Sequence, residues 1–286
     1  MAQSTRDIKR RIKGIGSTRQ ITKAMELVSS TKVRRRREKM EKTRPYYNTV
    51  LESIQRVLRN VSVNHRLLEK REVKKALYIP MNGDRGLAGG YNANINRLVD
   101  DKFKDDKDSI SLITVGSNSR DFFTGRDYDV IESYVGISED PHFSDAKEIG
   151  QLAMKLFIEG EIDEINVVFT DFISTMNYEP KILKLLPSDE IKKDEEKDKP
   201  HVIIDFEPSA GEVLEYLIPK YIESSIYGAL IEASTSEQSA RQSAMKSATD
   251  NADDIIEELN MEYNRARQAA ITIELSEIVA GAEALK

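Results

Sequence analysis

The glycine-rich stretch Met81 to Tyr91, MNGDRGLAGGY, has the residue types most typical of ligand chemistry in this chain. It follows a predicted strand and opens a predicted helix, which is where loops that bind phosphate groups lie. It matches neither the G-x-G-x-x-G nor the G-x-x-x-x-G-K-S/T pattern, and no lysine directly follows its glycines. The stretch therefore favours a tight turn with close packing of a helix on a sheet over a nucleotide site.

Other patterns typical of catalysis are missing from the sequence. His65, His142 and His201 have no second histidine three or four residues away, which argues against metal ligation. The absence of cysteine excludes disulfides, zinc–thiolate sites and thiol catalysis. There is no G-x-S-x-G motif, and the acidic residues are evenly spread. We therefore expect no catalytic residues, metal site, cofactor or small-molecule substrate.

The basic run Arg34, Arg35, Arg36 and Arg37 could contact nucleic acid. Consecutive arginines on a helix point all around it, however, and no aromatic residues for base stacking lie nearby. The run favours a charged face that meets an acidic partner. A nucleic-acid-binding coiled coil remains an alternative.

Both ends of the chain predict unusually long helices. Residues 221–286 contain no proline and have glycine only at Gly228 and Gly281, and in the first sixty residues Pro45 is the only proline. A continuous helix over 221–286 would be about 100 Å long, far beyond the mean helix of about 11–12 residues. Such a helix cannot fold into one globular core.

The two terminal segments have the pattern of coiled-coil partners. Residues 1–60 carry a net charge of +12 and residues 211–286 a net charge of −8, which favours pairing. Because the chain must leave one helix end and return to the other, the pair is predicted to be antiparallel. The apolar seams, with spacings of three and four interrupted by phase shifts, are Ile8, Ile12, Ile15, Ile21, Met25, Val28, Val50, Ile54, Val57 and Val61, then Ile256, Leu259, Tyr263, Ala266, Ala270 and Ile273.

The middle of the chain alternates short β-rich runs with helical patterns, which predicts a mainly parallel sheet with covering helices. The predicted strands are 73–79, 110–115, 128–132 and 165–172, with an edge or antiparallel strand at 181–186; the predicted helices are 87–103, 119–125 and 144–159. The segment 187–200 is nearly all charge and predicts a surface loop, and 202–206 is an apolar run. Pro219 either kinks the last helix or marks its start.

The predicted fold class is therefore α/β with long helices: an antiparallel two-helix coiled coil plus a Rossmann-like α/β domain. The expected domains are 1–62, 70–207 and 208–286, the first and last packing together. If the helices cover about residues 4–60 and 212–286, the last one extends past its partner by roughly 25 Å. Because Ile271, Ile278 and Leu285 belong to an apolar set on more than one face there, another protein must cover it.

Four long motifs resemble the gamma subunit of F-type ATP synthase, of the bacterial type. They are ITKAMELVSSTKVRR (Ile21 to Arg35), GDRGLAGGYN (Gly83 to Asn92), SEQSARQSAMKSATDNA (Ser236 to Ala252) and YNRARQAAITIELSEIVAGAEAL (Tyr263 to Leu285). The central sheet and its acidic loop resemble this family only in layout.

The resemblance implies a central rotor shaft without an active site of its own. In that family the coiled coil stands inside a ring of three alpha and three beta subunits, and the lower end binds the epsilon subunit and the membrane c-ring. Proton flow turns the ring, and catalysis belongs to beta. The resemblance also implies a location at the cytoplasmic face of the bacterial membrane, peripheral to it through the complex. The alternative from the enzyme class is a nucleotide-dependent α/β enzyme.

Matched motifs carry the family's contact residues onto this chain. The resemblance places Met25 opposite a beta-subunit lever, and it makes Arg241 of the C-terminal helix one of the residues that bind the alpha and beta subunits and help couple the shaft to beta. It makes Arg267 and Gln268 a polar catch against beta, and Glu207 a neighbour of the c-ring and epsilon. Thr272, Glu274, Ile278 and Leu285 follow on the same surface as the catch. Ordinary packing or solvation is the alternative at each position.

Overall fold

The computed structural model describes residues 5–60, 66–68, 71–174, 177–188, 207 and 209–284. In chain order the helices and strands are α1 (Thr5–Asn60), β1 (Ala76–Pro80), α2 (Tyr91–Phe103), β2 (Ile110–Val115), α3 (Ser117–Thr124), β3 (Val130–Tyr134), α4 (Phe143–Glu159), β4 (Glu164–Ser174), β5 (Asn177–Leu186) and α6 (Ala210–Ala284), with 3-10 turns at Arg66–Leu68 and Lys107–Ser109. The chain forms two compact units, unit 1 with residues 1–29 and 242–286, and unit 2 with residues 30–241.

The long terminal helices are present and contribute residues to both units. α6 begins at Ala210, after Ser209, whose hydroxyl accepts a hydrogen bond from the Glu212 amide at 3.3 Å, as an N-cap residue does. Pro219 lies inside α6 and Pro45 inside α1, so Pro219 does not mark a helix start. The apolar run 202–206, most of the charged segment 187–200 and Leu285 lie outside the described residues.

In unit 1 the two helices pair antiparallel. The Thr22 and Thr249 hydroxyls lie 2.8 Å apart, and Arg19 forms an ion pair with Asp253. The seam predicted in α1 is wrong at Ile21 and Val28, which are 61% and 56% exposed, and the seam predicted in α6 is exposed at Ala270 and Ile273. Small polar residues, Thr22 and Ser29, are buried instead, so the contacting stripe is shifted by one residue. Small side chains in a helix interface let the two backbones approach closely.

In unit 2 the strands form a five-stranded sheet in the order β3-β2-β1-β4-β5. β1 pairs in parallel with β2 and β4, β2 pairs in parallel with β3, and β5 is antiparallel to β4. The predicted fold class is confirmed, including the antiparallel strand at the edge. The predicted strand 110–115 has the bounds of β2, whereas β5 begins at Asn177, earlier than the expected 181.

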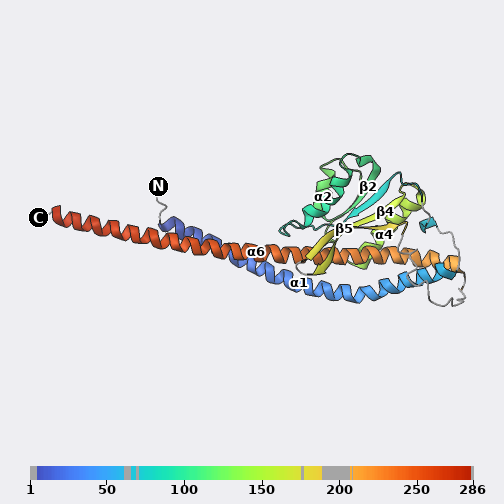
Figure 1. Ribbon diagram of the computed structural model, residues 1–286, viewed down its shortest axis with the longest axis horizontal. Helices are drawn as coiled ribbons and strands as arrows, with labels where there is room; N and C mark the ends of the chain where they lie inside the picture. Colours follow the sequence, from blue (N-terminus) through green and yellow to red (C-terminus); the bar gives the residue numbers. More distant parts are fainter. Residues whose placement is uncertain are drawn as a thin grey trace. The chain divides into compact units, whose positions relative to one another are not determined.

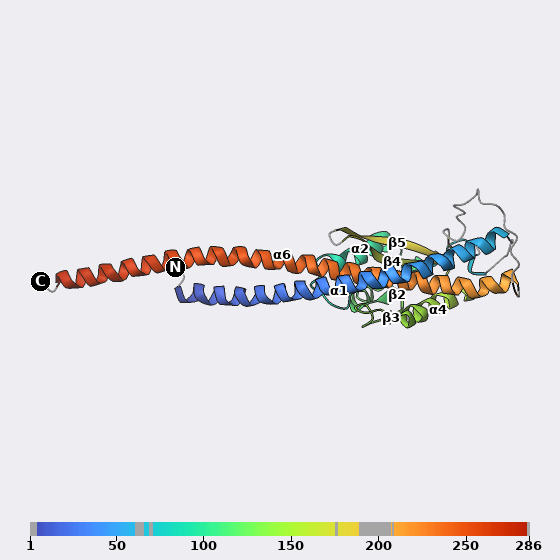
Figure 2. The ribbon, with the colours of Figure 1, turned by 90° about the horizontal axis from the view of Figure 1, so that it is seen from below.

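Alternating side chains of the central strands supply two cores. Leu77 and Ile79 of β1 pack in a large cluster with residues of α4, α6 and α1. Ala76 and Tyr78 point to the other face, where they pack with residues of α2 and α3. Figure 1 shows α2 on one side of the sheet and α6 on the other. Figure 2, together with a Tyr47–Tyr221 ring contact of 5.7 Å, shows α1 and α6 side by side in this unit.

Candidate partner-binding surfaces

The glycine-rich stretch after β1 forms a turn in which Gly83 and Asp84 are hydrogen-bonded to neighbouring parts of the chain. The Gly83 amide donates to Asn92 Oδ1 at 3.0 Å, and Asn118 Nδ2 donates to the Gly83 carbonyl at 2.6 Å. The Asp84 carboxylate accepts hydrogen bonds from the Ser117 amide at 3.0 Å and from the Ser138 hydroxyl at 2.8 Å. These donors are therefore engaged in packing the turn, which disfavours the nucleotide-dependent enzyme.

Arg241 of α6 lies in a buried polar network beneath this turn. Its Nη2 donates to Glu237 Oε1 at 2.6 Å and to the carbonyls of Arg85 and Gly86 at 3.3 and 3.1 Å. Burial raises the pKa of Glu237, against the opposing effect of Arg241. A side chain added at Gly83 would lie 2.7 Å from Glu237, so the turn packs directly on the ion pair. Arg241 thus supports the turn from inside the unit.

The predicted basic run divides between the interior and the surface. Arg36 is buried, whereas Arg34, Arg35 and Arg37 are exposed. Burial lowers the pKa of Arg36, against the attraction of Glu237, Asp140 and Glu139. Only the three exposed arginines can therefore meet another molecule.

Sequence reasoning missed the acidic partners of this part of α1. Burial alone would raise the pKa of Glu139, but the hydrogen bond from Lys32 at 3.1 Å and the charges of Lys32, Arg85 and Arg241 together outweigh it and lower that pKa. Lys39 donates to the Pro141 carbonyl at 2.7 Å. The Glu139 carboxylate and the Pro141 carbonyl belong to the segment between β3 and α4. In the sequence, only the short acidic motif SEDP at 138–141 indicates these partners of α1.

The last part of α6, residues 264–282, is exposed at every position except the half-buried Ala266. We call this part the apolar tip, because its large apolar residues are Ile271, Ile273, Leu275, Ile278 and Val279, all 47–64% exposed. Figure 1 shows it continuing beyond the first residues of α1 within unit 1. Arg267, Gln268, Thr272 and Glu274 lie on it, and the Thr272 hydroxyl donates to the Gln268 carbonyl at 2.9 Å.

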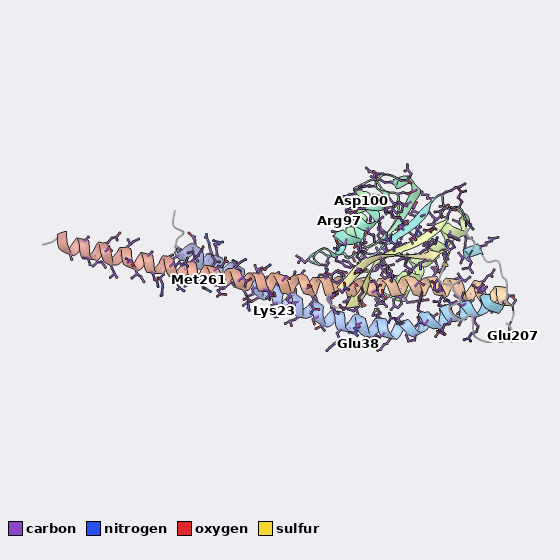
Figure 3. The ribbon with its side chains drawn as sticks, viewed as in Figure 1. Lys23, Glu38, Arg97, Asp100, Glu207 and Met261 are labelled. Carbon is purple, nitrogen blue, oxygen red and sulfur yellow. The ribbon has the colours of Figure 1, made fainter. Side chains whose placement is uncertain are left out.

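The remaining candidates lie elsewhere. Met25 is half-buried in unit 1, and Glu207 is exposed. Figure 3 labels Glu207 beside the start of α6, and Met261 on α6 just before the apolar tip. Met25 and the residues of the apolar tip therefore belong to unit 1, and Glu207 belongs to unit 2. Among the described residues, no three histidine, aspartate or glutamate side chains are placed to hold a metal ion, and no helix is long and apolar enough to span a membrane.

Comparison with known proteins agrees with this architecture. The ATP synthase family model matches residues 4–285. The chain is 50% identical over 290 residues to the ATP synthase gamma chain of Alkaliphilus metalliredigens, covering 100% of both chains. It is 45% identical over 302 residues to the sodium-ion-specific ATP synthase gamma chain of Acetobacterium woodii, again covering 100% of both.

The solved structures that match this chain are also ATP synthase structures, at lower sequence identity. A central stalk and c-ring structure of the Tetrahymena thermophila mitochondrial ATP synthase matches with a TM-score of 0.62 and 26% identity, over 80% of this chain and 99% of that one. A Euglena gracilis mitochondrial ATP synthase structure matches in fold, with a TM-score of 0.68 and 18% identity, over 98% of this chain and 94% of that one. The chain therefore belongs to the family of bacterial-type ATP synthase gamma chains.

Proposed function

We propose that this gamma chain is the central rotor shaft of an F-type ATP synthase and carries torque between the c-ring and a catalytic ring of alpha and beta subunits. The apolar tip is the observation that supports this most. A helix with apolar side chains on several faces is normally buried, and within unit 1 nothing covers the described residues 267–282. A surrounding ring of partner subunits would supply that cover.

The proposed mechanism requires no chemistry on this chain. Catalysis belongs to beta, and each beta site is biased by its different contacts with the asymmetric shaft, which is what coupling between distant sites requires. An apolar surface suits a turning contact because rotation breaks few directional polar bonds. In unit 1, α1 and α6 are joined by the contact of the Thr22 and Thr249 hydroxyls. Two helices paired in this way resist twisting better than a single helix.

Separate surfaces serve the proposed partners. Arg267 and Gln268, with Thr272, Glu274 and Ile278 beyond them, would contact the alpha and beta subunits. Met25 would face beta from α1. Arg34, Arg35 and Arg37 are exposed and would meet an acidic beta segment. Arg241 would act indirectly, by holding the turn after β1 in place.

The start of α6, in unit 2, would attach the shaft to the membrane sector. Glu207 is exposed just before α6 and would lie near the c-ring and the epsilon subunit. We further propose 1–62, 70–207 and 208–286 as the functional divisions of the chain. The protein would act at the cytoplasmic face of the cell membrane, held there by its complex.

Co-purification tests this function directly. A tag on the chain, expressed at its natural level, should recover alpha, beta and epsilon subunits and the c-ring in fixed ratio. Recovery of the chain alone, or of nucleic acid that leaves at high salt, would refute the assignment. In the recovered complex, a bead fixed to this chain should turn during ATP hydrolysis.

A further inference from the structure

The segment 135–142 between β3 and α4 contacts three other parts of unit 2, and we call it the clasp. Its first contact is with the glycine-rich turn. The Ser138 hydroxyl donates to the Asp84 carboxylate at 2.8 Å and accepts a hydrogen bond from the Asp84 amide at 3.0 Å. Arg85 adds an ion pair with Glu139 at 3.5 Å. Because this turn directly follows β1, these contacts fix the clasp to the sheet.

The second contact of the clasp is with α1. Lys32 donates to the Glu139 carboxylate at 3.1 Å, and Lys39 donates to the Pro141 carbonyl at 2.7 Å. Lys39 also pairs with Asp140 at 3.5 Å. Lys32 and Lys39 lie about two helical turns apart and so project from the same face of α1. The clasp therefore holds one face of this helix.

The third contact of the clasp is with α6. The Ser234 hydroxyl donates to the Glu139 carbonyl at 3.1 Å. Directly after the clasp, the Phe143 ring meets the Tyr227 ring edge-on, with 5.5 Å between the ring centres. Lys39 Nζ lies 5.7 Å from the centre of the same Tyr227 ring. Glu139 is thus bonded to both helices, to α1 through its carboxylate and to α6 through its carbonyl.

These polar contacts hold a part of α1 that the main apolar core does not. The residues that α1 adds to the large hydrophobic cluster of unit 2 lie within 47–58, and among the described residues none of 30–44 belongs to it. Met40 and Arg44 instead line a groove of about 300 Å³, together with Phe169 of β4. The position of 30–44 on the sheet therefore depends on its polar contacts.

We propose that the clasp fixes α1 and α6 to the sheet, so that the helices and the sheet of unit 2 move as one body. Hydrogen bonds are directional and resist sliding, whereas apolar packing is non-directional and permits it. Glu139 is the positioning residue at the centre of the clasp. Its role in torque rests on the proposed rotor function, in which load on the helices reaches the sheet through the clasp.

Hydrogen exchange of the full chain tests the clasp without the complex. Glu139→Ala removes the carboxylate that binds Lys32, so the amides of 30–44 in α1 should exchange about fivefold faster, as the loss of a strong, partly buried ion pair allows. Glu161→Ala, at an exposed glutamate of the loop after α4, is the matched control and should leave these rates unchanged.

Lys32→Met tests the same contact from the side of α1. It should reproduce the faster exchange of 30–44, and the double variant with Glu139→Ala should be close to either single one, because both remove one contact. Lys42→Met, at an exposed lysine of the same helix, is its control. Unchanged exchange in both single variants, or strictly additive effects in the double one, would refute the clasp.

The assembled complex tests the load on the clasp. Because the chain has no cysteine, Arg97→Cys on α2 or Glu38→Cys on α1 gives it a single point for attaching a bead. Both residues are exposed, and Figure 3 labels them. Both beads should turn during ATP hydrolysis, and Glu139→Ala should widen the angular fluctuations of the α2 bead but not those of the α1 bead. A general loss of stability would not separate the two beads.

The two experiments distinguish failure of the clasp from failure of the rotor function. If neither bead turns in the native complex, the rotor function fails, and the exchange rates of 30–44 decide whether the clasp fixes α1 to the sheet. If both beads turn and Glu139→Ala leaves their fluctuations alike, the clasp carries no load and the proposal is refuted.

Discussion

The hydroxyl groups of Thr22 and Thr249 lie 2.8 Å apart inside unit 1, although 227 positions separate them in the sequence. Each hydroxyl oxygen also lies within hydrogen-bonding distance of a carbonyl of its own helix, Thr22 at 3.0 Å from Arg19 and Thr249 at 2.8 Å from Met245, so one hydroxyl donates to the other and that one donates to its own helix. A buried hydroxyl pair of this kind specifies which turns of the two helices face each other, because any shift leaves polar groups against apolar neighbours.

Replacing one threonine of this pair should lower the stability of the chain about as much as replacing both. We expect Thr22→Val or Thr249→Val to lower the free energy of unfolding by about 0.5–1.5 kcal/mol, with the double variant close to either single one. A double-mutant cycle by thermal unfolding of the full chain measures the coupling. Thr18→Val, at an exposed position of the same helix, is the control. Strictly additive effects would show that the hydroxyls do not interact.

The glycine-rich turn gives a prediction with a matched control. A methyl group at Gly83 would lie 2.7 Å from Glu237, which is held by Arg241, whereas nothing lies within 4 Å of the same position at Gly86. Gly83→Ala should therefore destabilise the chain by about 1–3 kcal/mol, the usual cost of overpacking, and Gly86→Ala should not. Unfolding of both variants measures the difference. Equal effects would mean that the turn does not pack on Glu237.

The physical origin of each feature decides how well sequence predicts it. β2 was predicted with its correct bounds because a buried central strand is rich in apolar and β-branched residues, as in ISLITV. The contacting stripe of α1 was misassigned at Ile21 and Val28, since apolar residues beside the seam are indistinguishable from residues in it. The network of Glu237, Arg241 and Glu139 was not predictable, because it joins segments distant in sequence and needs the fold to bring them together.

Glu237 should make stability depend on pH. Burial raises the pKa of Glu237 above its ordinary value of 4.5, so its stabilising contribution is complete below that value and is lost as pH rises through the folded-state pKa. The unfolding temperature should therefore fall with rising pH above 4.5, and Glu237→Gln should remove that part of the slope. An unchanged slope in Glu237→Gln would contradict this account.

The basic run should divide into two functions. Arg36→Gln removes a buried cation from among Glu237, Asp140 and Glu139 and should lower the free energy of unfolding by about 1–3 kcal/mol. Neutralising the exposed Arg34, Arg35 and Arg37 together should change stability by no more than about 0.5 kcal/mol each. That triple variant should instead raise the ATPase activity of the assembled complex, if the charges hold the rotor against hydrolysis. Unchanged activity would refute the proposed contact with beta.

The apolar tip gives the sharpest test of the rotor assignment, because its side chains are exposed in this chain and would be covered only in the complex. Ile273 and Ile278 are 59% and 64% exposed. Ile273→Asp and Ile278→Asp should therefore change the unfolding of the isolated chain by no more than about 0.5 kcal/mol. In the complex each would bury an unpaired carboxylate, so assembly yield or ATPase activity should fall sharply. Ile255→Asp, on α6 before the tip and 42% exposed, is the control and should assemble normally. Normal assembly and activity of both tip variants would mean that no partner encloses the tip.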